Sequence, residues 1–181
     1  PLVTGIATGD RSAVTVPDKL VVHGADRLQG RYRVPGAKNA VLPMIAAALL
    51  TDEPCHLSNV PAIEDVEIML ELVRRLGAHV DYDRRASSVS ITADNITSFE
   101  PDAEVVNEMR ASFLVAGPLL SRFGEFRCIH PGGCDLGIRP VNVDVQGFQV
   151  MGATVETEQS SYIANAPPRL QGTRIYLDYP S

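Results

Sequence analysis

Residues 131–140, Pro-Gly-Gly-Cys-Asp-Leu-Gly-Ile-Arg-Pro, place the thiol of Cys134 five positions before the guanidinium of Arg139. A cation near a cysteine favours the thiolate, and the same cation can hold an anionic substrate against the sulfur. Gly132 and Gly133 would let the backbone approach a ligand closely. We interpret this loop as a reaction site; the alternative is a glycine-rich turn around a buried cysteine.

Two further cations, Lys38 and Arg110, each precede an apolar stretch that we expect to be helical. A cation at the amino end of a helix opposes the macrodipole, and a bound anion would remove that conflict. Asn39 could donate to the same anion or cap the helix. Arg110 could bind a phosphate or pair with Glu104 or Glu108. These residues indicate an anion-binding region.

Other potentially reactive groups point to no second site. Asp65 and Asp135 lack a neighbour that would make either a base, so we interpret both as solvated or capping carboxylates. Cys55 and Cys128 lie in apolar segments and are expected in the core. The four histidines lack metal-ligand spacing, so no metal site is expected.

The composition is that of a soluble globular protein of 181 residues, with 45% hydrophobic and 21% charged residues. The net charge of -6 argues against nucleic acid or an anionic membrane as the main partner, but it permits a small anionic ligand. The longest apolar run, 40–50, is too short to span a bilayer. Three cysteines without a Cys-x-x-Cys pair favour a reducing, cytoplasmic location.

Patterning along the chain predicts an α/β fold. Residues 1–19 are expected to form a flexible tail. The pattern predicts strands at 20–24 and 28–34, an enclosed helix at 39–50, an amphipathic helix at 63–76, and hairpin strands at 78–82 and 88–91. Every side of the 39–50 helix is apolar, which predicts cover all around it.

The sequence repeats itself. Cys55 and Cys128 are 73 residues apart, and Gly77 and Gly152 are 75 apart. The apolar helix face recurs in the second copy at Val141, Val145, Phe148 and Met151. We therefore expect two repeats, 38–98 and 99–181, each a helix, a strand, a helix and a strand pair, with 174–178 as the last strand. Because such a repeat cannot bury its inner helix alone, self-association through unpaired edges is possible.

Several motifs in order resemble the UDP-N-acetylglucosamine enolpyruvyl transferases of peptidoglycan synthesis, over residues 20–181. The matching motifs are Gly36-Ala-Lys-Asn-Ala40, Met109-Arg-Ala-Ser112, Gly117-Pro-Leu-Leu120, Pro131-Gly-Gly-Cys134 and Arg139-Pro-Val141. The resemblance implies an inside-out α/β barrel of βαβαββ units. It also implies that the 20–37 strands belong to another domain, and that a third unit and the rest of that domain are absent.

The resemblance further implies transfer of the enolpyruvyl group of phosphoenolpyruvate to the 3-hydroxyl of UDP-N-acetylglucosamine, with release of phosphate and no metal or organic cofactor. Lys38 and Asn39 match the residues that contact phosphoenolpyruvate. Cys134 matches the proton donor that fosfomycin alkylates, and Arg139 matches an arginine that holds the substrate phosphate. Arg110 matches a contact of the nucleotide sugar. Cys134, Lys38 and Arg139 would be the catalytic residues.

The segment expected around the uridine comprises Arg139, Pro140, Val141, Asn142 and Val143. This chain has Asn142-Val143-Asp144 where the family usually has Asp-Leu-His, which weakens that expectation. The family's enzymes are longer, and their general-base aspartate lies outside this stretch, so we expect a fragment with negligible turnover. The alternatives are a non-catalytic remnant, a thiol enzyme with Cys134 as nucleophile, or the sister shikimate-pathway transferase, which Lys38-Asn39 and the thiol loop disfavour.

Overall fold

The computed structural model describes residues 24, 27, 29–131, 141–158 and 160–176. The chain divides into two compact parts, 1–33 and 34–181, and the fold below belongs to the second part. The tail expected at 1–19 lies outside the described residues. Residues 29–34 are described, and they form no strand, so the strand predicted at 28–34 is wrong there. Its apolar alternation favours a strand, but a strand also needs a neighbour to pair with.

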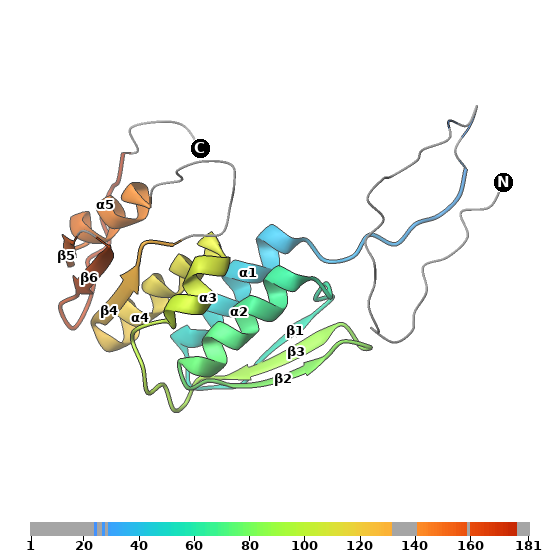
Figure 1. Cartoon of the computed structure of the whole chain (residues 1–181), viewed down its shortest axis with the longest axis horizontal. Helices are drawn as coiled ribbons and strands as arrows, with labels where there is room; N and C mark the ends of the chain where they lie inside the picture. The colour runs from blue at the N-terminus through green and yellow to red at the C-terminus, as the bar shows by residue number, and fades with distance from the viewer. Residues whose placement is uncertain (1–23, 25–26, 28, 132–140, 159, 177–181) are drawn as a thin grey trace. The chain divides into compact units, whose positions relative to one another are not determined.

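The elements of the second part follow a similar order twice, with one additional helix, α3, in the second series (Figure 1). The first repeat contains α1 (Lys38–Ala47), the 3-10 helix η1 (Ala48–Leu50), β1 (Cys55–Ser58), α2 (Glu64–Arg75), β2 (His79–Asp83) and β3 (Ser88–Thr92). The second contains α3 (Ala103–Glu108), the 3-10 helix η2 (Arg110–Val115), α4 (Ala116–Phe123), β4 (Glu125–Ile129), α5 (Asn142–Val150), β5 (Thr154–Thr157) and β6 (Ser161–Asn165). A similar series of elements therefore recurs along the chain, and both strands of the hairpin predicted in the first repeat form where expected.

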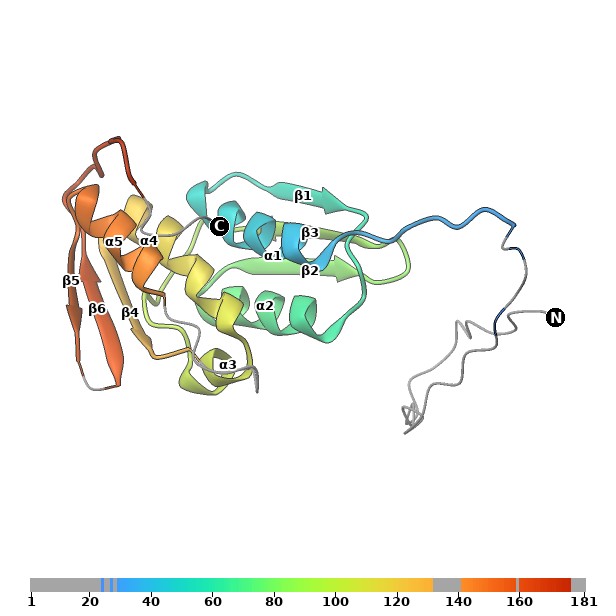
Figure 2. The ribbon, with the colours of Figure 1, turned by 90° about the horizontal axis from the view of Figure 1, so that it is seen from above.

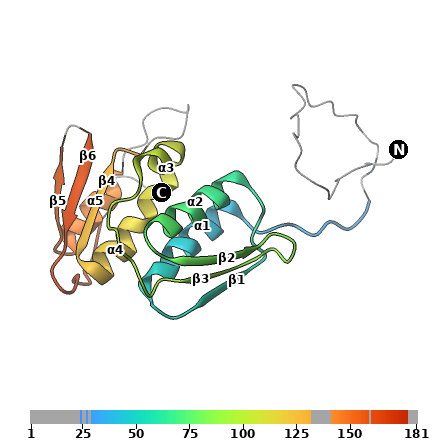
Figure 3. The same ribbon diagram turned by 60° about the horizontal axis from the view of Figure 1, so that its bottom comes forward.

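Each repeat builds a three-stranded antiparallel sheet, in the order β1-β3-β2 and β4-β6-β5 (Figure 3). Cys55 on β1 lies opposite Ile91, and Cys128 on β4 lies opposite Tyr162. The matched glycines also play one role. Gly77 and Gly152 follow α2 and α5 with φ of +113° and +102°, in the left-handed region that favours glycine.

A single hydrophobic core joins the two repeats. The helices α1 and α2 cover one face of the first sheet, as Figure 2 shows. The apolar face of α2 is fully buried at Val66, Leu70, Val73 and Leu76. Full burial of one such aliphatic side chain stabilises the fold by about 1.5–3 kcal/mol. Leu119 and Leu120 of α4 are also fully buried, so the second repeat contributes to the same core.

The inner helix of the first repeat is not enclosed on every side, contrary to the sequence prediction. Ile45 and Leu49 are completely buried, but Met44 and Leu50 are 52% and 53% exposed. The face predicted for α5 is also only partly covered, because Val145 and Phe148 are half-buried. The described residues cover these helices on some sides only. An apolar composition indicates that a helix can be buried, but it does not show which elements cover it.

Two further element predictions need correction. Residues 174–176 carry no strand, and the last strand of the second sheet is β6, which pairs with both β4 and β5. The alternating residues at 174–178 have strand propensity, but propensity alone does not provide a partner strand, and the partners of β6 are β4 and β5. The short helix α3 was not predicted, although Asp102 caps it by accepting a hydrogen bond from the Glu104 backbone N–H at 3.0 Å.

Candidate active site

Lys38 is the first residue of α1, and Gly36 lies two residues before it. Gly36 approaches the backbone of Asn59 and the ring of Pro61 so closely that an added Cβ would collide with the Asn59 carbonyl. The glycine therefore holds the start of α1 against the connection from β1 to α2. No side chain caps the α1 amino end, so the capping role considered for Asn39 is not observed.

The ammonium of Lys38 forms an ion pair with Asp65, with 2.7 Å between Nζ and Oδ2. Asp65 lies in the first turn of α2, where the positive end of the macrodipole favours a carboxylate. The interpretation of Asp65 as a solvated or capping carboxylate is therefore incomplete, since it contacts a candidate site residue. The two side chains are 52% and 36% exposed, so the pair stays accessible to a ligand.

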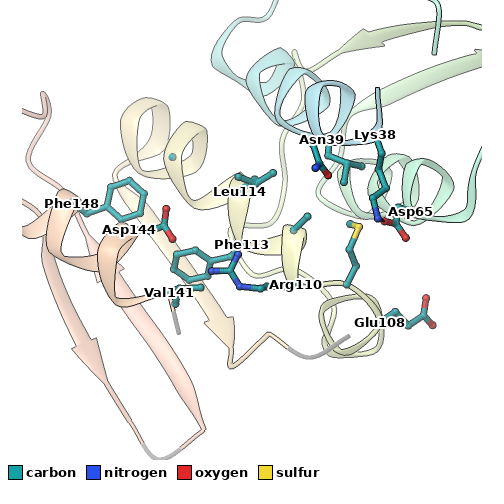
Figure 4. Close-up of a pocket in the computed structure, with 14 residues that line it drawn as sticks. Lys38, Asn39, Asp65, Glu108, Arg110, Phe113, Leu114, Val141, Asp144 and Phe148 are labelled. Atoms are coloured by element: carbon teal, nitrogen blue, oxygen red, sulfur yellow. Dashed lines mark ion pairs between the residues drawn. The ribbon is translucent and has the colours of Figure 1, made fainter. Parts of the chain in front are cut away.

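A pocket of about 520 Å³ lies where the two repeats meet (Figure 4). Its lining residues are Lys38, Asn39, Leu42, Asp65, Glu108, Met109, Arg110, Ala111, Phe113, Leu114, Gly117, Val141, Asp144 and Phe148. The first repeat supplies the start of α1 and Asp65. The second supplies the end of α3, the 3-10 helix η2, Gly117 of α4, Val141 before α5, and Asp144 and Phe148 of α5. Only the packing of the repeats brings these elements together.

The lining combines charge with apolar surface. Its cations are Lys38 and Arg110, and its carboxylates are Asp65, Glu108 and Asp144. Figure 4 shows Lys38 and Asp65 on one side of the pocket and Arg110 on the other, with the Arg110 side chain extending toward Phe113. Such a pocket can bind a molecule that carries an anionic group and also uncharged surface.

The structure places the predicted site residues as follows. Lys38, Asn39, Arg110 and Val141 line the same pocket. Val141 is buried at the amino end of α5, and Asn142 and Val143 follow it in the first turn without lining the pocket. Cys134, Arg139 and Pro140 lie outside the described residues.

Sequence reasoning missed several lining residues. Phe113 packs edge-on against Phe126 and Tyr162, with ring centroids 5.4 and 5.6 Å apart, and this packing anchors the pocket wall. Phe148 had been assigned only to a helix face. No sequence signal marked Glu108 or Asp144 as lining residues, because their place in the pocket depends on how the two repeats pack.

The two cysteines in the described part differ in burial. Cys128 is completely buried, as predicted, and burial, with a contribution from Glu100, raises the pKa of its thiol to about 12. Cys55 is half-buried, so the core prediction holds only partly for it. A thiol such as Cys128 is neutral at physiological pH and unsuited to nucleophilic chemistry.

Within the described residues, no cluster of three or more His, Cys, Asp or Glu side chains could hold a metal ion. No helix in that part of the chain is both long and apolar enough to cross a membrane.

The two sheets, their helices and the pocket between the repeats define an α/β fold of the enolpyruvyl transferase type. The chain belongs to the family of EPSP synthase (3-phosphoshikimate 1-carboxyvinyltransferase), whose family model matches residues 22–181. The enolpyruvyl transferase NikO from Streptomyces tendae has a similar structure, with a TM-score of 0.67 and 26% identity over 83% of this chain and 32% of its own. An EPSP synthase from Acinetobacter baumannii shares the fold at 20% identity, with a TM-score of 0.62, over 84% of this chain and 35% of its own.

Curated relatives confirm the resemblance found in the sequence. The chain is 42% identical to UDP-N-acetylglucosamine 1-carboxyvinyltransferase 1 of Clostridium acetobutylicum over 164 residues, which are 91% of this chain and 39% of the relative. It is 45% identical to UDP-N-acetylglucosamine 1-carboxyvinyltransferase 2 of Carboxydothermus hydrogenoformans, over 91% of this chain and 38% of the relative. The chain thus spans about two fifths of the length of these relatives.

Proposed function

We propose that this chain supplies the substrate-binding pocket of an enzyme that transfers the enolpyruvyl group of phosphoenolpyruvate to the 3-hydroxyl of UDP-N-acetylglucosamine. The observation that carries the proposal is that Lys38, Asn39 and Arg110 line one pocket, although they come from different repeats. The names of the curated relatives give UDP-N-acetylglucosamine and the transfer of a carboxyvinyl group; phosphoenolpyruvate as the donor comes from the family resemblance. Phosphate is the second product.

The reaction needs an acid, a base and cations beside the phosphate. In the addition step, the sugar 3-oxygen bonds to C2 of phosphoenolpyruvate and loses its proton to a base, while a proton is added to C3. In the elimination step, the bond from C2 to the phosphate oxygen breaks, phosphate leaves with the electron pair, and the new methyl group loses a proton. Cations fixed beside the phosphate stabilise the charge as it leaves. We assign this role to Lys38, with Asn39 as a neutral donor beside it, because both line the pocket.

The proton for C3 is assigned to Cys134 and a second phosphate contact to Arg139, both from the resemblance alone. A thiol and a guanidinium suit these tasks, because an acid must reach the methylene carbon and a forked cation binds phosphate through two contacts.

Arg110 and the start of α5 are proposed to hold the nucleotide sugar. Arg110 lies across the pocket from Lys38, and the apolar side chains of Phe113 and Phe148 offer flat surfaces between the charged groups. In this proposal Pro140, Val141, Asn142 and Val143 surround the uridine. The exposed Asn142 would donate from its amide where the family usually has an aspartate.

The choice of acceptor is the finer part of the proposal. Shikimate 3-phosphate is the alternative, because the matching family model is that of EPSP synthase. The sequence Lys38-Asn39 and the identity of 42% or 45% to relatives named for UDP-N-acetylglucosamine favour the sugar nucleotide.

Titrations of the 181-residue chain with each acceptor test this choice. We expect the backbone amide NMR signals of residues 108–114 and 141–148 to shift with UDP-N-acetylglucosamine and to be unaffected by shikimate 3-phosphate. We expect Lys38→Gln to weaken the binding of phosphoenolpyruvate added to the sugar-nucleotide complex. Shifts with shikimate 3-phosphate alone would exclude the proposed acceptor, and unchanged binding by Lys38→Gln would exclude the proposed site.

We infer a cytoplasmic role in peptidoglycan synthesis, hence in cell shape and division, because UDP-N-acetylglucosamine is a precursor found there. No metal or organic cofactor is needed for the steps above. We expect the chain by itself to release negligible phosphate from the two substrates, and a phosphate assay at the full rate would contradict this. Self-association through the outer edges of β1, β2, β4 and β5 is a further proposal, which sedimentation can test.

A further inference from the structure

The pair of Lys38 and Asp65 connects the starts of two helices across the pocket wall. Lys38 begins α1, Asp65 lies in the first turn of α2, and 2.7 Å separates Nζ from Oδ2. Both residues line the pocket. Among the described residues, Asp65 is the carboxylate within ion-pair distance of Lys38.

We propose that Asp65 is a positioning residue that aims the Lys38 ammonium at the anionic group of the substrate. An ammonium has three N–H donors. Asp65 occupies one of them and leaves the others for the ligand, so a single cation can bridge the protein carboxylate and a phosphate. This inference rests on the proposed function, because it takes phosphoenolpyruvate as the anion.

The first physical reason is conformational entropy. A lysine side chain has four rotatable bonds, and fixing it costs up to about 2 kcal/mol. At 52% exposure, the Lys38 side chain is only loosely held by packing. The ion pair fixes the ammonium in the pocket before the ligand arrives, so less of this cost falls on binding.

The second reason is the arrangement of the two helix dipoles. The amino end of α1 disfavours the charge of Lys38, whereas the amino end of α2 favours that of Asp65. The dipole of α2 thus stabilises the Asp65 carboxylate. Asp65 in turn compensates the charge of Lys38, which the dipole of α1 disfavours. The sequence suggested that a bound anion offsets the unfavourable position of Lys38 at the amino end of α1. The Asp65 carboxylate already supplies part of that compensation.

Asp65 and the incoming anion carry charges of the same sign, and repulsion between them would act in the opposite direction. If Asp65 mainly repelled the incoming anion, its neutralisation would tighten binding. If it mainly positions Lys38, neutralisation weakens binding, and a carboxylate one methylene longer restores part of the affinity.

The chain offers a clean spectroscopic probe, because Lys19 and Lys38 are its only lysines. In protein labelled with ¹⁵N at the lysine Nζ, a Lys19→Arg background leaves one side-chain ammonium signal. We would follow that signal, and the affinity for phosphoenolpyruvate in the presence of UDP-N-acetylglucosamine, in the parent chain, Asp65→Asn, Asp65→Glu and Glu64→Gln. Glu64 is the matched control, since it is an exposed acid of the same helix turn that lies outside the pocket lining.

We expect Asp65→Asn to weaken phosphoenolpyruvate binding about fivefold, in line with the loss of one exposed ion pair and its ordering effect. We also expect it to shift the Lys38 ammonium signal in the free protein. Asp65→Glu should recover part of the affinity, and Glu64→Gln should leave both readouts unchanged.

Equal or tighter binding by Asp65→Asn would overturn the inference, as would the same loss in Glu64→Gln. These results differ from failure of the proposed function. If Lys38→Gln binds phosphoenolpyruvate as the parent does, the site itself is wrong; if Lys38→Gln loses binding while Asp65→Asn retains it, only the positioning role fails.

Discussion

Arg122 donates a hydrogen bond of 2.7 Å from Nη1 to the backbone carbonyl of Ala93, joining the inner helix of the second repeat to the residue that follows β3. The same nitrogen lies 3.2 and 3.1 Å from the carbonyl oxygens of Leu49 and Thr51, at the end of η1. One guanidinium therefore satisfies carbonyls at the close of α1–η1 and of the first sheet. This contact joins the two repeats beside their shared hydrophobic core.

We predict that Arg122→Met lowers the free energy of unfolding by about 2 kcal/mol, because partly buried backbone carbonyl groups lose their charged hydrogen-bond donor. Thermal and urea unfolding followed by circular dichroism measure the change. Arg127→Met is the matched control: Arg127 is exposed on the adjoining strand, and its replacement should change the stability by less than about 0.5 kcal/mol. Equal losses in the two variants would contradict the role given to Arg122.

Gly36→Ala should destabilise the fold and also impair the site. The new Cβ would meet the backbone carbonyl of Asn59, and relief of such an overlap costs about 1 to 3 kcal/mol. Because Gly36 lies two residues before Lys38, the start of α1 should move. Gly172→Ala is the control, since nothing lies within 4 Å of its Cβ position. An unchanged melting temperature and unchanged phosphoenolpyruvate binding in Gly36→Ala would refute the prediction.

Cys128 should resist alkylation in the folded protein. Burial raises the pKa of its thiol from the ordinary value of 9.0 to about 12, so at pH 8 it is neutral and shielded. Iodoacetamide followed by mass spectrometry should leave Cys128 unlabelled until denaturant is added. Rapid labelling in native buffer would show that the strand opens.

The raised pKa of Cys128 also predicts a pH dependence. The folded state retains the proton better than the unfolded state does, so the stabilisation is complete below pH 9 and is lost as the pH rises toward 12. Unfolding free energies across that range should fall more steeply for the parent chain than for Cys128→Ala. Parallel slopes would contradict the assignment.

Asp102 should contribute stability that is lost in acid. The backbone N–H of Glu104, and then the side chain of Arg75, lower the pKa of Asp102 below its ordinary value of 3.8. The folded state therefore releases the proton more readily, and the contribution is present above pH 4 and declines as the pH falls through the lowered pKa. Asp102→Asn should flatten the melting temperature below pH 4 relative to the parent. The same acid dependence in both proteins would argue against a role for this cap.

Fosfomycin should modify Cys134 in preference to the other two cysteines. The expectation comes from the family resemblance and from the glycine-rich sequence around Cys134, whereas Cys128 is buried and Cys55 half-buried. Peptide mass spectrometry of the intact chain after treatment provides the measurement, with UDP-N-acetylglucosamine added in a parallel sample. Equal modification of all three thiols, or none at Cys134, would count against a formed site.

Much of the fold could be predicted because its signals are local. The spacing of Val66, Leu70, Val73 and Leu76 predicts α2, and that face is fully buried. The strand pair before and after Asp83 follows from alternation and a polar turn, in which the Asp83 carboxylate accepts hydrogen bonds from the N–H groups of Arg85 and Ala86. The strands predicted at 28–34 and 174–178 are wrong where described, because strand propensity does not provide a neighbouring strand.

The sequence by itself determined the repeat, the helix starts that carry Lys38 and Arg110, and the family. These properties depend on residue type and spacing, which can be read directly from the sequence. Only the tertiary structure showed that Asp65 pairs with Lys38, that Asp144 and Phe148 face the same pocket, and that Arg122 ties one repeat to the other. The Lys38–Asp65 and Arg122–Ala93 contacts join residues that are 27 and 29 positions apart. Their formation depends on how helices and sheets pack, and periodicity within one element carries no information about that geometry.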